Sequence, residues 1–142
     1  MRRQESMLRL RRFKVEEMAR QLSTLDAMRT DLERKLADLQ DAVARERQRC
    51  NDTDIGRLAF PSFLRSIESR REKINDSLKE IGRERAQCDV GLSAGREELK
   101  GLELAAEQEA RRLAEAEARR SQSRLDEMAL LRHLRKHALR GT

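Results

Sequence analysis

Aromatic residues are nearly absent from this sequence. It has no tryptophan and no tyrosine, and its phenylalanines are Phe13, Phe60 and Phe63. Compact domains use aromatic side chains as bulky filler for the hydrophobic core. A chain of 142 residues with so few of them does not have the composition of a compact globular domain. The shortage favours long helices that pack along a narrow line.

Long apolar runs are also missing. No stretch approaches the roughly 20 apolar residues that a membrane-spanning helix requires. The N-terminal Met1-Arg2-Arg3 leads into further charged residues. It does not lead into the apolar segment of a secretory signal peptide. We therefore expect a cytoplasmic protein.

The two cysteines, Cys50 and Cys88, show no metal-ligand spacing. If the chain folds back on itself near Pro61, the thiols lie roughly 40 Å apart along a helix that rises about 1.5 Å per residue. A disulfide cannot span that distance. We expect two free thiols in a reducing compartment.

What the sequence does contain is charge, at 41% of residues, and a heptad repeat of apolar residues on each side of Pro61. Apolar residues spaced 3.5 apart on average form a narrow seam that requires a partner helix. The economical partner is the other half of the same chain. The stripe before the proline, which Arg29 interrupts, consists of Val15, Met18, Leu22, Leu25, Arg29, Leu32, Leu36, Leu39 and Val43. The stripe after it, which Arg71 and Arg85 interrupt, consists of Leu64, Ile67, Arg71, Ile74, Leu78, Ile81, Arg85, Cys88, Leu92, Gly95, Leu99, Leu102 and Ala106.

These stripes predict an all-α fold, an antiparallel two-helix coiled-coil hairpin with an overhanging C-terminal helix, as one domain over residues 1–142. Helix one is expected at about 6–50, the turn at 51–60 and helix two at about 61–139, because proline suits the first turn of a helix. Residue i then faces about residue 110 − i, so Gly95 faces Val15. An open form in which two chains pair as one long dimer remains an alternative.

Positive charge is concentrated at the two termini. The first fourteen residues carry a net charge of +5, and the last eleven carry +4. Such ends favour an acidic protein surface, an anionic membrane or nucleic acid. Specific nucleic-acid binding is disfavoured, because the basic N-terminal run has no asparagine to read adenine and few aromatics to stack on bases.

No motif for catalysis or for a cofactor is present. The chain has no Gly-Lys-Ser/Thr phosphate loop. His133 and His137 have metal-ligand spacing, but no third ligand accompanies them, so two exposed histidines are the simpler interpretation. A two-helix hairpin also offers no concave pocket. We therefore expect no catalytic, cofactor-binding or metal-binding residues, and a protein that is not an enzyme.

Two local segments carry a family resemblance. Residues 7–15, Met-Leu-Arg-Leu-Arg-Arg-Phe-Lys-Val, open the first heptad helix, and Ala59-Phe60-Pro61-Ser62-Phe63 follows a short acidic loop. With the long Glu/Arg/Ala-rich second helix, this layout resembles the FliJ family of flagellar export proteins. The resemblance implies a hairpin that enters the hexameric export ATPase (FliI) and stimulates it. It also implies contact with the export gate protein (FlhA), recycling of export chaperones, and peripheral association with the inner membrane through the apparatus.

The resemblance and the charge map together suggest two binding surfaces at opposite ends. For the ATPase we expect Arg2, Arg3, Arg9, Arg11 and Arg12. For the export gate we expect an exposed apolar cluster of Phe60, Phe63, Leu64 and Ile67. The phenylalanines could instead close the hairpin as a small plug. The alternative function is a generic cytosolic coiled-coil scaffold that binds a partner helix or an anionic surface.

Overall fold

The structure is a computed structural model that describes residues 2–141. It contains helix α1 (Arg2–Cys50) and helix α2 (Asp54–Arg140), and no strand within the described residues. Contacts divide the chain into two compact units. The hairpin unit comprises Arg9–Glu97, and the terminal unit comprises Met1–Leu8 with Glu98–Thr142. The prediction of an all-α fold is confirmed, whereas that of one domain over residues 1–142 stays a prediction.

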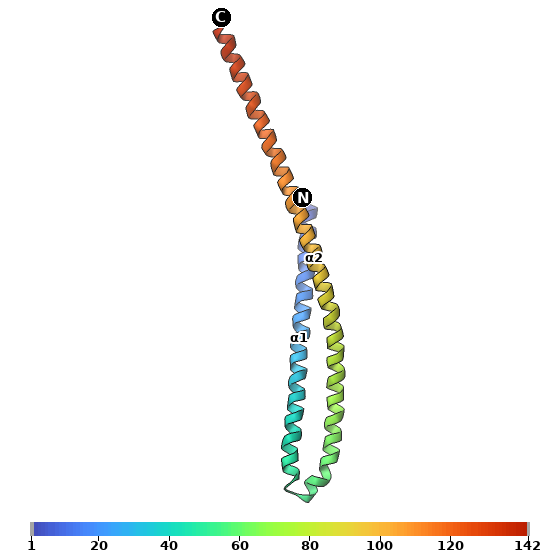
Figure 1. Cartoon of the computed structure of the whole chain (residues 1–142). Coiled ribbons are helices and arrows are strands. Elements are labelled where there is room, and N and C mark those ends of the chain that lie inside the picture. Colours follow the sequence, from blue (N-terminus) through green and yellow to red (C-terminus); the bar gives the residue numbers. More distant parts are fainter. Residues whose placement is uncertain (1, 142) are drawn as a thin grey trace. The chain divides into compact units, whose positions relative to one another are not determined.

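Within the hairpin unit, α1 and α2 run antiparallel beside each other (Figure 1). The close approach of Gly95 to α1 fixes their register. A Cβ added to Gly95 would lie 3.4 Å from Val15 Cγ2 and 3.3 Å from Met18 Cε. Two turns earlier in α2, the Cys88 thiol donates to the Met18 carbonyl at 3.3 Å. The predicted pairing of residue i with about residue 110 − i is therefore confirmed at this height.

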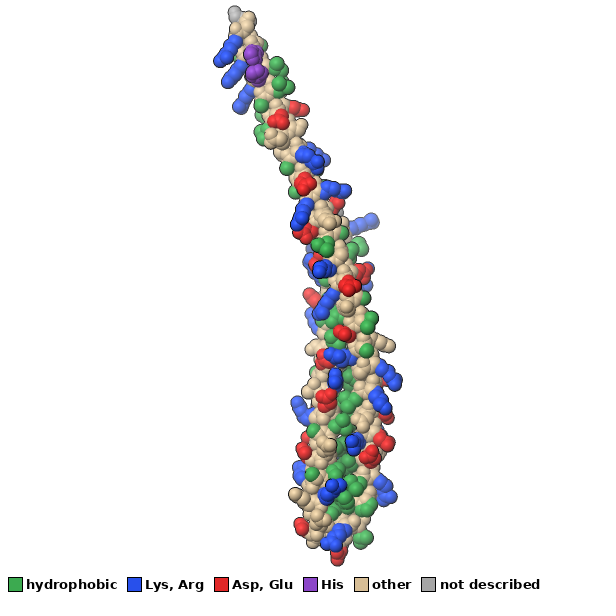
Figure 2. Space-filling model, viewed as in Figure 1, with side chains coloured by type: hydrophobic (Ala, Val, Ile, Leu, Met, Phe, Trp, Pro, Cys, Tyr) green, Lys and Arg blue, Asp and Glu red, His purple; other side chains and the backbone are tan. Residues whose placement is uncertain are grey.

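The apolar seam lies between the two helices, where Figure 2 shows hydrophobic side chains gathered along the hairpin. Among the described residues, four apolar side chains are buried: Cys50, Ile67, Ile81 and Leu92. The other apolar positions of both predicted stripes within the hairpin unit are half-buried. Two helices cover each other on one side only, so most seam residues keep an edge in water.

The turn is shorter than the sequence predicted. Helix α2 begins at Asp54, and Asn51–Thr53 form the whole connection. Thr53 caps the new helix, because its Oγ1 accepts the Gly56 N–H at 3.1 Å and its carbonyl accepts the Arg57 N–H at 3.2 Å. The carboxylate of Asp54 in the first turn adds a favourable interaction with the helix dipole.

Pro61 consequently lies inside α2, and the prediction that the helix starts there is wrong. Proline has no N–H to donate to the carbonyl four residues earlier, and this normally costs about 3 kcal/mol in a helix interior. The Thr53 cap and the contact of Phe60 with Arg47 of α1 stabilise the two turns that precede Pro61. Gly56 is not the bend of the turn either. It has no positive φ, and a Cβ there would meet Thr53 Oγ1 at 2.7 Å and Cys50 Cα at 3.2 Å.

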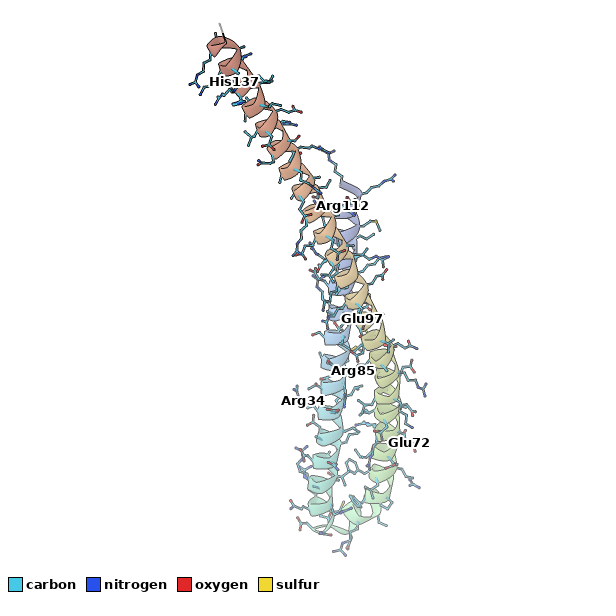
Figure 3. The ribbon with its side chains drawn as sticks, turned by 45° about the horizontal axis from the view of Figure 1, so that its top comes forward. Arg34, Glu72, Arg85, Glu97, Arg112 and His137 are labelled. Carbon is cyan, nitrogen blue, oxygen red and sulfur yellow. The ribbon has the colours of Figure 1, made fainter. Side chains whose placement is uncertain are left out.

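The arginines within the seam take different positions. Arg85 is half-buried and donates from Nε to Asp26 Oδ1 at 2.5 Å, which joins the two helices. Figure 3 labels Arg85 together with Arg34 and Glu72, two exposed residues of the hairpin. Arg29 is exposed and pairs with Glu33 of its own helix at 3.1 Å. Arg85 thus links the two helices, whereas Arg29 stays on the surface of α1.

The terminal unit has its own, thinner apolar line. Four seam residues are half-buried, namely Leu8, Leu99, Leu102 and Ala106. Farther along α2, Arg111 pairs with Glu107 at 2.9 Å, and Arg112 pairs with Glu109 at 2.8 Å. Every residue from 121 to 141 is exposed.

Candidate partner-binding surfaces

The basic N-terminal residues predicted to face the ATPase are divided between the two units. Arg2 and Arg3 belong to the terminal unit, and both are exposed. In the hairpin unit, Arg9 and Arg12 are exposed and Arg11 is half-buried. All five are on α1, which positions the side chains by its regular rise.

Two apolar side chains accompany the arginines of the hairpin unit. Leu10 is 54% exposed and Phe13 is 56% exposed, so neither is buried in the seam. The heptad of α1, counted backwards from Val15 by four, reaches half-buried Arg11 and leaves Leu10 and Phe13 off the seam. The segment therefore presents cations with apolar neighbours, a combination suited to a protein partner with acidic and apolar features.

The residues predicted to face the export gate are less exposed than expected. Phe60, Phe63 and Leu64 are half-buried, and Ile67 retains 8% of its accessible surface. The expectation that all four lie uncovered beside the turn is wrong. Extrapolated backwards, the heptad of α2 places Phe60 and Ile67 on the seam itself, and α1 covers them there.

The two phenylalanines pack against each other and against α1. Their ring centroids are 6.4 Å apart with the planes 26° from parallel. The Arg47 guanidinium lies 6.0 Å from the centre of the Phe60 ring, which is within the range of a cation–π interaction. This arrangement supports the alternative in which the phenylalanines close the end of the hairpin.

The exposed apolar side chains beside the turn are instead Ile55 and Leu58. They are 82% and 83% exposed, and they are three residues apart in the first two turns of α2. The sequence analysis missed them because it placed this segment in the loop. The signal was available: Thr53 followed by Asp54 is a helix-capping sequence, and a helix starting there puts both residues off the seam.

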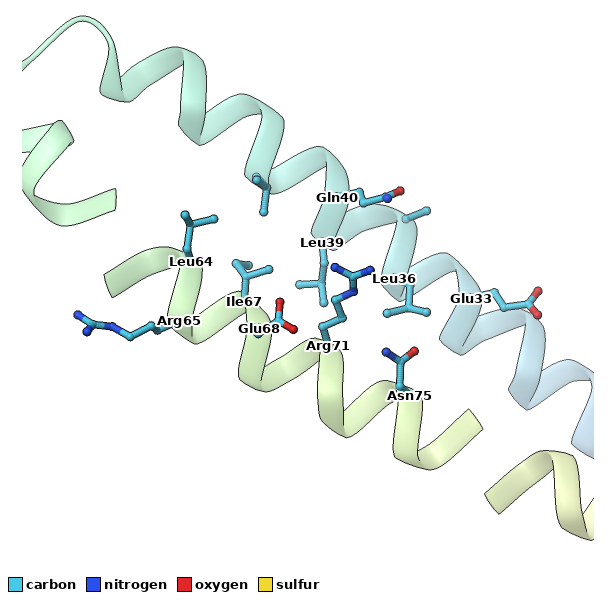
Figure 4. A pocket seen from close by; sticks show the side chains of 12 residues that line it. Glu33, Leu36, Leu39, Gln40, Leu64, Arg65, Ile67, Glu68, Arg71 and Asn75 are labelled. Carbon is cyan, nitrogen blue, oxygen red and sulfur yellow. The ribbon is translucent and has the colours of Figure 1, made fainter. Parts of the chain in front are cut away.

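A shallow apolar groove follows the seam on one side of the hairpin (Figure 4). Its floor is formed by leucines and isoleucine from both helices, including Leu36, Leu39, Leu64 and Ile67. Arg71 reaches across from α2 beside Leu36 and Leu39 in this view. Charged side chains, among them Glu33, Glu68 and Arg71, border this floor, so the groove can receive apolar side chains of a partner between polar edges.

The Cys50 thiol is enclosed by the turn. Its Sγ lies 3.1 Å from the Gly56 carbonyl, and the residue keeps 5% of its accessible surface. Burial raises the pKa of this thiol, and the Glu46 carboxylate raises it further. Cys50 and Cys88 are both free thiols, as predicted. A buried thiol held in its protonated form is a poor nucleophile.

Residues 2–141 contain neither a group of metal-ligating side chains nor a membrane-spanning helix. No group of three or more His, Cys, Asp or Glu side chains in that range could hold a metal ion. The His133 and His137 rings meet edge to face, with their centroids 4.4 Å apart. Neither α1 nor α2, over the part that the structure describes, contains a segment long and apolar enough to cross a membrane.

These features define the chain as an all-helical protein built on an antiparallel two-helix hairpin. Comparison with families of known proteins agrees with this class. The family model of the flagellar FliJ protein matches residues 1–138. The chain therefore belongs to the FliJ family, and this membership indicates a role connected with flagellar protein export. Direct comparisons with curated proteins and with solved structures give no match.

Proposed function

We propose that the protein is a non-enzymatic component of the flagellar type III export apparatus and acts as the central stalk of its hexameric ATPase. The observation that carries the proposal is the antiparallel hairpin Arg9–Glu97 in a chain of the FliJ family. A two-helix rod is narrow enough to enter the pore of a ring, which a globular domain of the same length is not. The stalk stimulates ATP hydrolysis and couples the ATPase to the export gate and to export chaperones.

The ATPase contact is assigned to the basic residues of α1. Exposed cations of the hairpin unit, Arg9 and Arg12, lie beside Leu10 and Phe13, and half-buried Arg11 adds a further charge. Arg2 and Arg3 of the terminal unit extend the assignment. Cationic side chains accelerate association with an acidic pore and orient the stalk within it.

The gate contact is assigned to the turn end of the hairpin. Phe60, Phe63 and Leu64 offer their accessible edges, and Ile67 supports them from the seam. Ile55 and Leu58 enlarge this apolar surface. Because Ile67 is buried, its contribution to binding is indirect, through the positions of its neighbours.

ATP hydrolysis by the purified export ATPase, measured with and without the protein, tests the proposal. A stalk raises the turnover rate, whereas a generic scaffold leaves it unchanged. Reversal of Arg9, Arg11 and Arg12 to Glu removes the stimulation. A matched variant reverses three arginines elsewhere on the hairpin, Arg34, Arg70 and Arg83, and keeps it. Equal loss in both variants would show that net charge, not the N-terminal segment, is responsible.

Binding to the cytoplasmic domain of the export gate protein tests the second surface. Ile55→Ser with Leu58→Ser changes only exposed side chains, so the hairpin keeps its stability while gate binding falls. Phe63→Ala weakens gate binding as well, yet it spares ATPase stimulation. Helical content measured by circular dichroism controls for folding. If these variants and the arginine reversal show identical losses in both assays, the assignment of two separate surfaces is wrong.

Peripheral association with the inner membrane follows from the same assignment, since the apparatus would hold the protein there. We also propose that α2 beyond about residue 107 overhangs the paired segment, which is consistent with the exposure of all residues from 121 to 141. Small-angle scattering with light scattering tests this geometry and separates the monomeric hairpin from an open dimer.

A further inference from the structure

The last turns of α2 carry a group of large, exposed apolar side chains. Every residue from 121 to 141 is exposed. Five large apolar side chains in the final stretch are between 56% and 79% exposed: Met128, Leu130, Leu131, Leu134 and Leu139. Single exposed leucines are ordinary, but a contiguous group of this size marks an interaction surface.

The helix sorts these residues onto one side. At about 100° per residue, the five apolar side chains and Ala138 fall within one half of the circumference. The opposite half holds Arg132, His133, Lys136, His137 and Arg140, with Ala129 among them, whereas Arg135 falls within the apolar half. The edge-to-face contact of the two histidine rings confirms that they share a face. Figure 2 shows the same division, with basic side chains and the histidines on one side and apolar side chains on the other.

The charge of this segment has one sign. Residues 128–141 contain four cations, Arg132, Arg135, Lys136 and Arg140, and no aspartate or glutamate. Arg132 borders the apolar half, and the long stem of Arg135 lies within it. Lysine and arginine stems can lie along an apolar surface while their charges reach water or a headgroup. An apolar half with cations at its border is the pattern of a helix that lies in a membrane interface.

We propose that residues 128–140 form an amphipathic helix that binds the surface of an anionic lipid bilayer. The apolar half enters the boundary between headgroups and acyl chains, and the cations meet lipid phosphates. The breadth of the apolar arc favours this occupant over a partner helix, because a coiled-coil seam is narrower. A second copy is disfavoured, since it would bring two purely cationic stripes together.

The absence of tryptophan makes insertion directly measurable. The variant Leu134→Trp places one fluorophore in the apolar half of the full-length protein. Vesicles of phosphatidylcholine mixed with phosphatidylglycerol should shift its emission to the blue, and vesicles of phosphatidylcholine alone should not. The matched control is Leu113→Trp, at a residue that is 42% exposed and lies outside the basic segment. An unshifted Leu134→Trp spectrum, or an equal shift in both variants, overturns the proposal.

Co-sedimentation with the same vesicles measures the affinity. Substitution of Arg132, Lys136 and Arg140 by Gln should weaken binding on the order of a hundredfold, given the usual contribution of one cation near an anionic surface. Substitution of Leu130 and Leu134 by Ser should weaken it about tenfold or more. The matched control replaces Arg112, Arg119 and Arg120 by Gln, and its affinity should change little. Equal weakening by the control overturns the proposal, because charge alone would then explain binding.

This proposal does not rest on the stalk function, and the two can fail separately. If the Leu130→Ser, Leu134→Ser variant loses vesicle binding and still stimulates the export ATPase, the lipid surface is a distinct site. If the variant loses stimulation and keeps vesicle binding, the apolar half belongs to a protein contact and the proposal is wrong.

Discussion

Arg85 and Asp26, which are 59 positions apart in the chain, meet across the hairpin through one charge-assisted hydrogen bond of 2.5 Å from Nε to Oδ1. The bond to Asp26, with the attraction of its charge, raises the pKa of Arg85 above its ordinary value. The side chains of Arg85 and Asp26 keep 40% and 46% of their accessible surface, so water screens the pair. Its main consequence is specificity. A polar pair at a single height of an apolar seam favours one register over its neighbours.

Removal of either partner should therefore lower the stability slightly, and removal of both should lower it no further. Arg85→Ala and Asp26→Ala should each lower the thermal midpoint by no more than a few degrees, and the double variant should resemble the single ones. Thermal unfolding followed by circular dichroism measures all three. The matched control is the pair Arg83–Glu80 within α2, at 3.7 Å, whose removal should change the midpoint even less. Additive losses for Arg85 and Asp26 would mean that they do not interact in solution.

Glycines of α2 should respond differently to alanine according to their surroundings. Gly82 has nothing within 4 Å of an added Cβ, so Gly82→Ala should stabilise the hairpin by about 1 kcal/mol through helix propensity alone. Gly95→Ala places its Cβ against Val15 and Met18 at 3.4 and 3.3 Å, which offsets much of that gain. Urea unfolding of both variants compares them. An equal gain at both positions would contradict the close approach at Gly95.

The close approach of Gly95 to Val15 allows a disulfide to test the register of the two helices. It also tests whether both helices come from the same chain. In a background with Cys50 and Cys88 replaced by Ser, Val15→Cys and Gly95→Cys should form an intramolecular bond on mild oxidation. The short distance from a Gly95 Cβ to Val15 Cγ2 suits disulfide geometry. A non-reducing gel should show a faster monomer. The control pair Val15→Cys and Gly82→Cys should not react, and a covalent dimer in place of the monomer would favour the open two-chain form.

The two thiols should differ in reactivity. Cys50 keeps 5% of its surface and its pKa is raised, whereas Cys88 is half-buried. A thiol reagent applied to the folded protein should therefore modify Cys88 first, and denaturant should remove the difference. Mass spectrometry of the labelled peptides identifies the order. Equal rates in the folded protein would show that the turn does not protect Cys50.

Stability should also fall at alkaline pH because of Cys50. Its raised pKa means that the folded state keeps the proton after the unfolded chain has begun to lose it. The contribution is complete below the ordinary thiol pKa and is lost as the pH rises through the folded value. Urea midpoints of the wild type and Cys50→Ala should therefore converge as the solution becomes alkaline. A constant difference between them across that range would exclude the linkage.

The sequence was sufficient for the seam and its register, because heptad spacing is a property that two packed helices must share. The contact of Gly95 with Val15 followed from counting alone. The start of α2 was not predicted correctly, since it was placed at Pro61 on the single rule that proline suits the first turn of a helix. The cap at Thr53 and the packing of Phe60 against Arg47 together favour a helix that already begins before Pro61. Exposure at the turn depends on this starting point, so Ile55 and Leu58 were missed for the same reason.

The position of Pro61 has a consequence for motion. The carbonyl of Arg57 accepts no hydrogen bond from Pro61, which has no N–H. The series of backbone hydrogen bonds in α2 is therefore interrupted between its first two turns and the rest of the helix. We expect residues 54–60 to unfold locally while the remaining hairpin stays folded. The Cys50 thiol loses its contact with the Gly56 carbonyl when these residues unfold. The accessibility of the Cys50 thiol therefore reports local unfolding, because it rises only while residues 54–60 are unfolded.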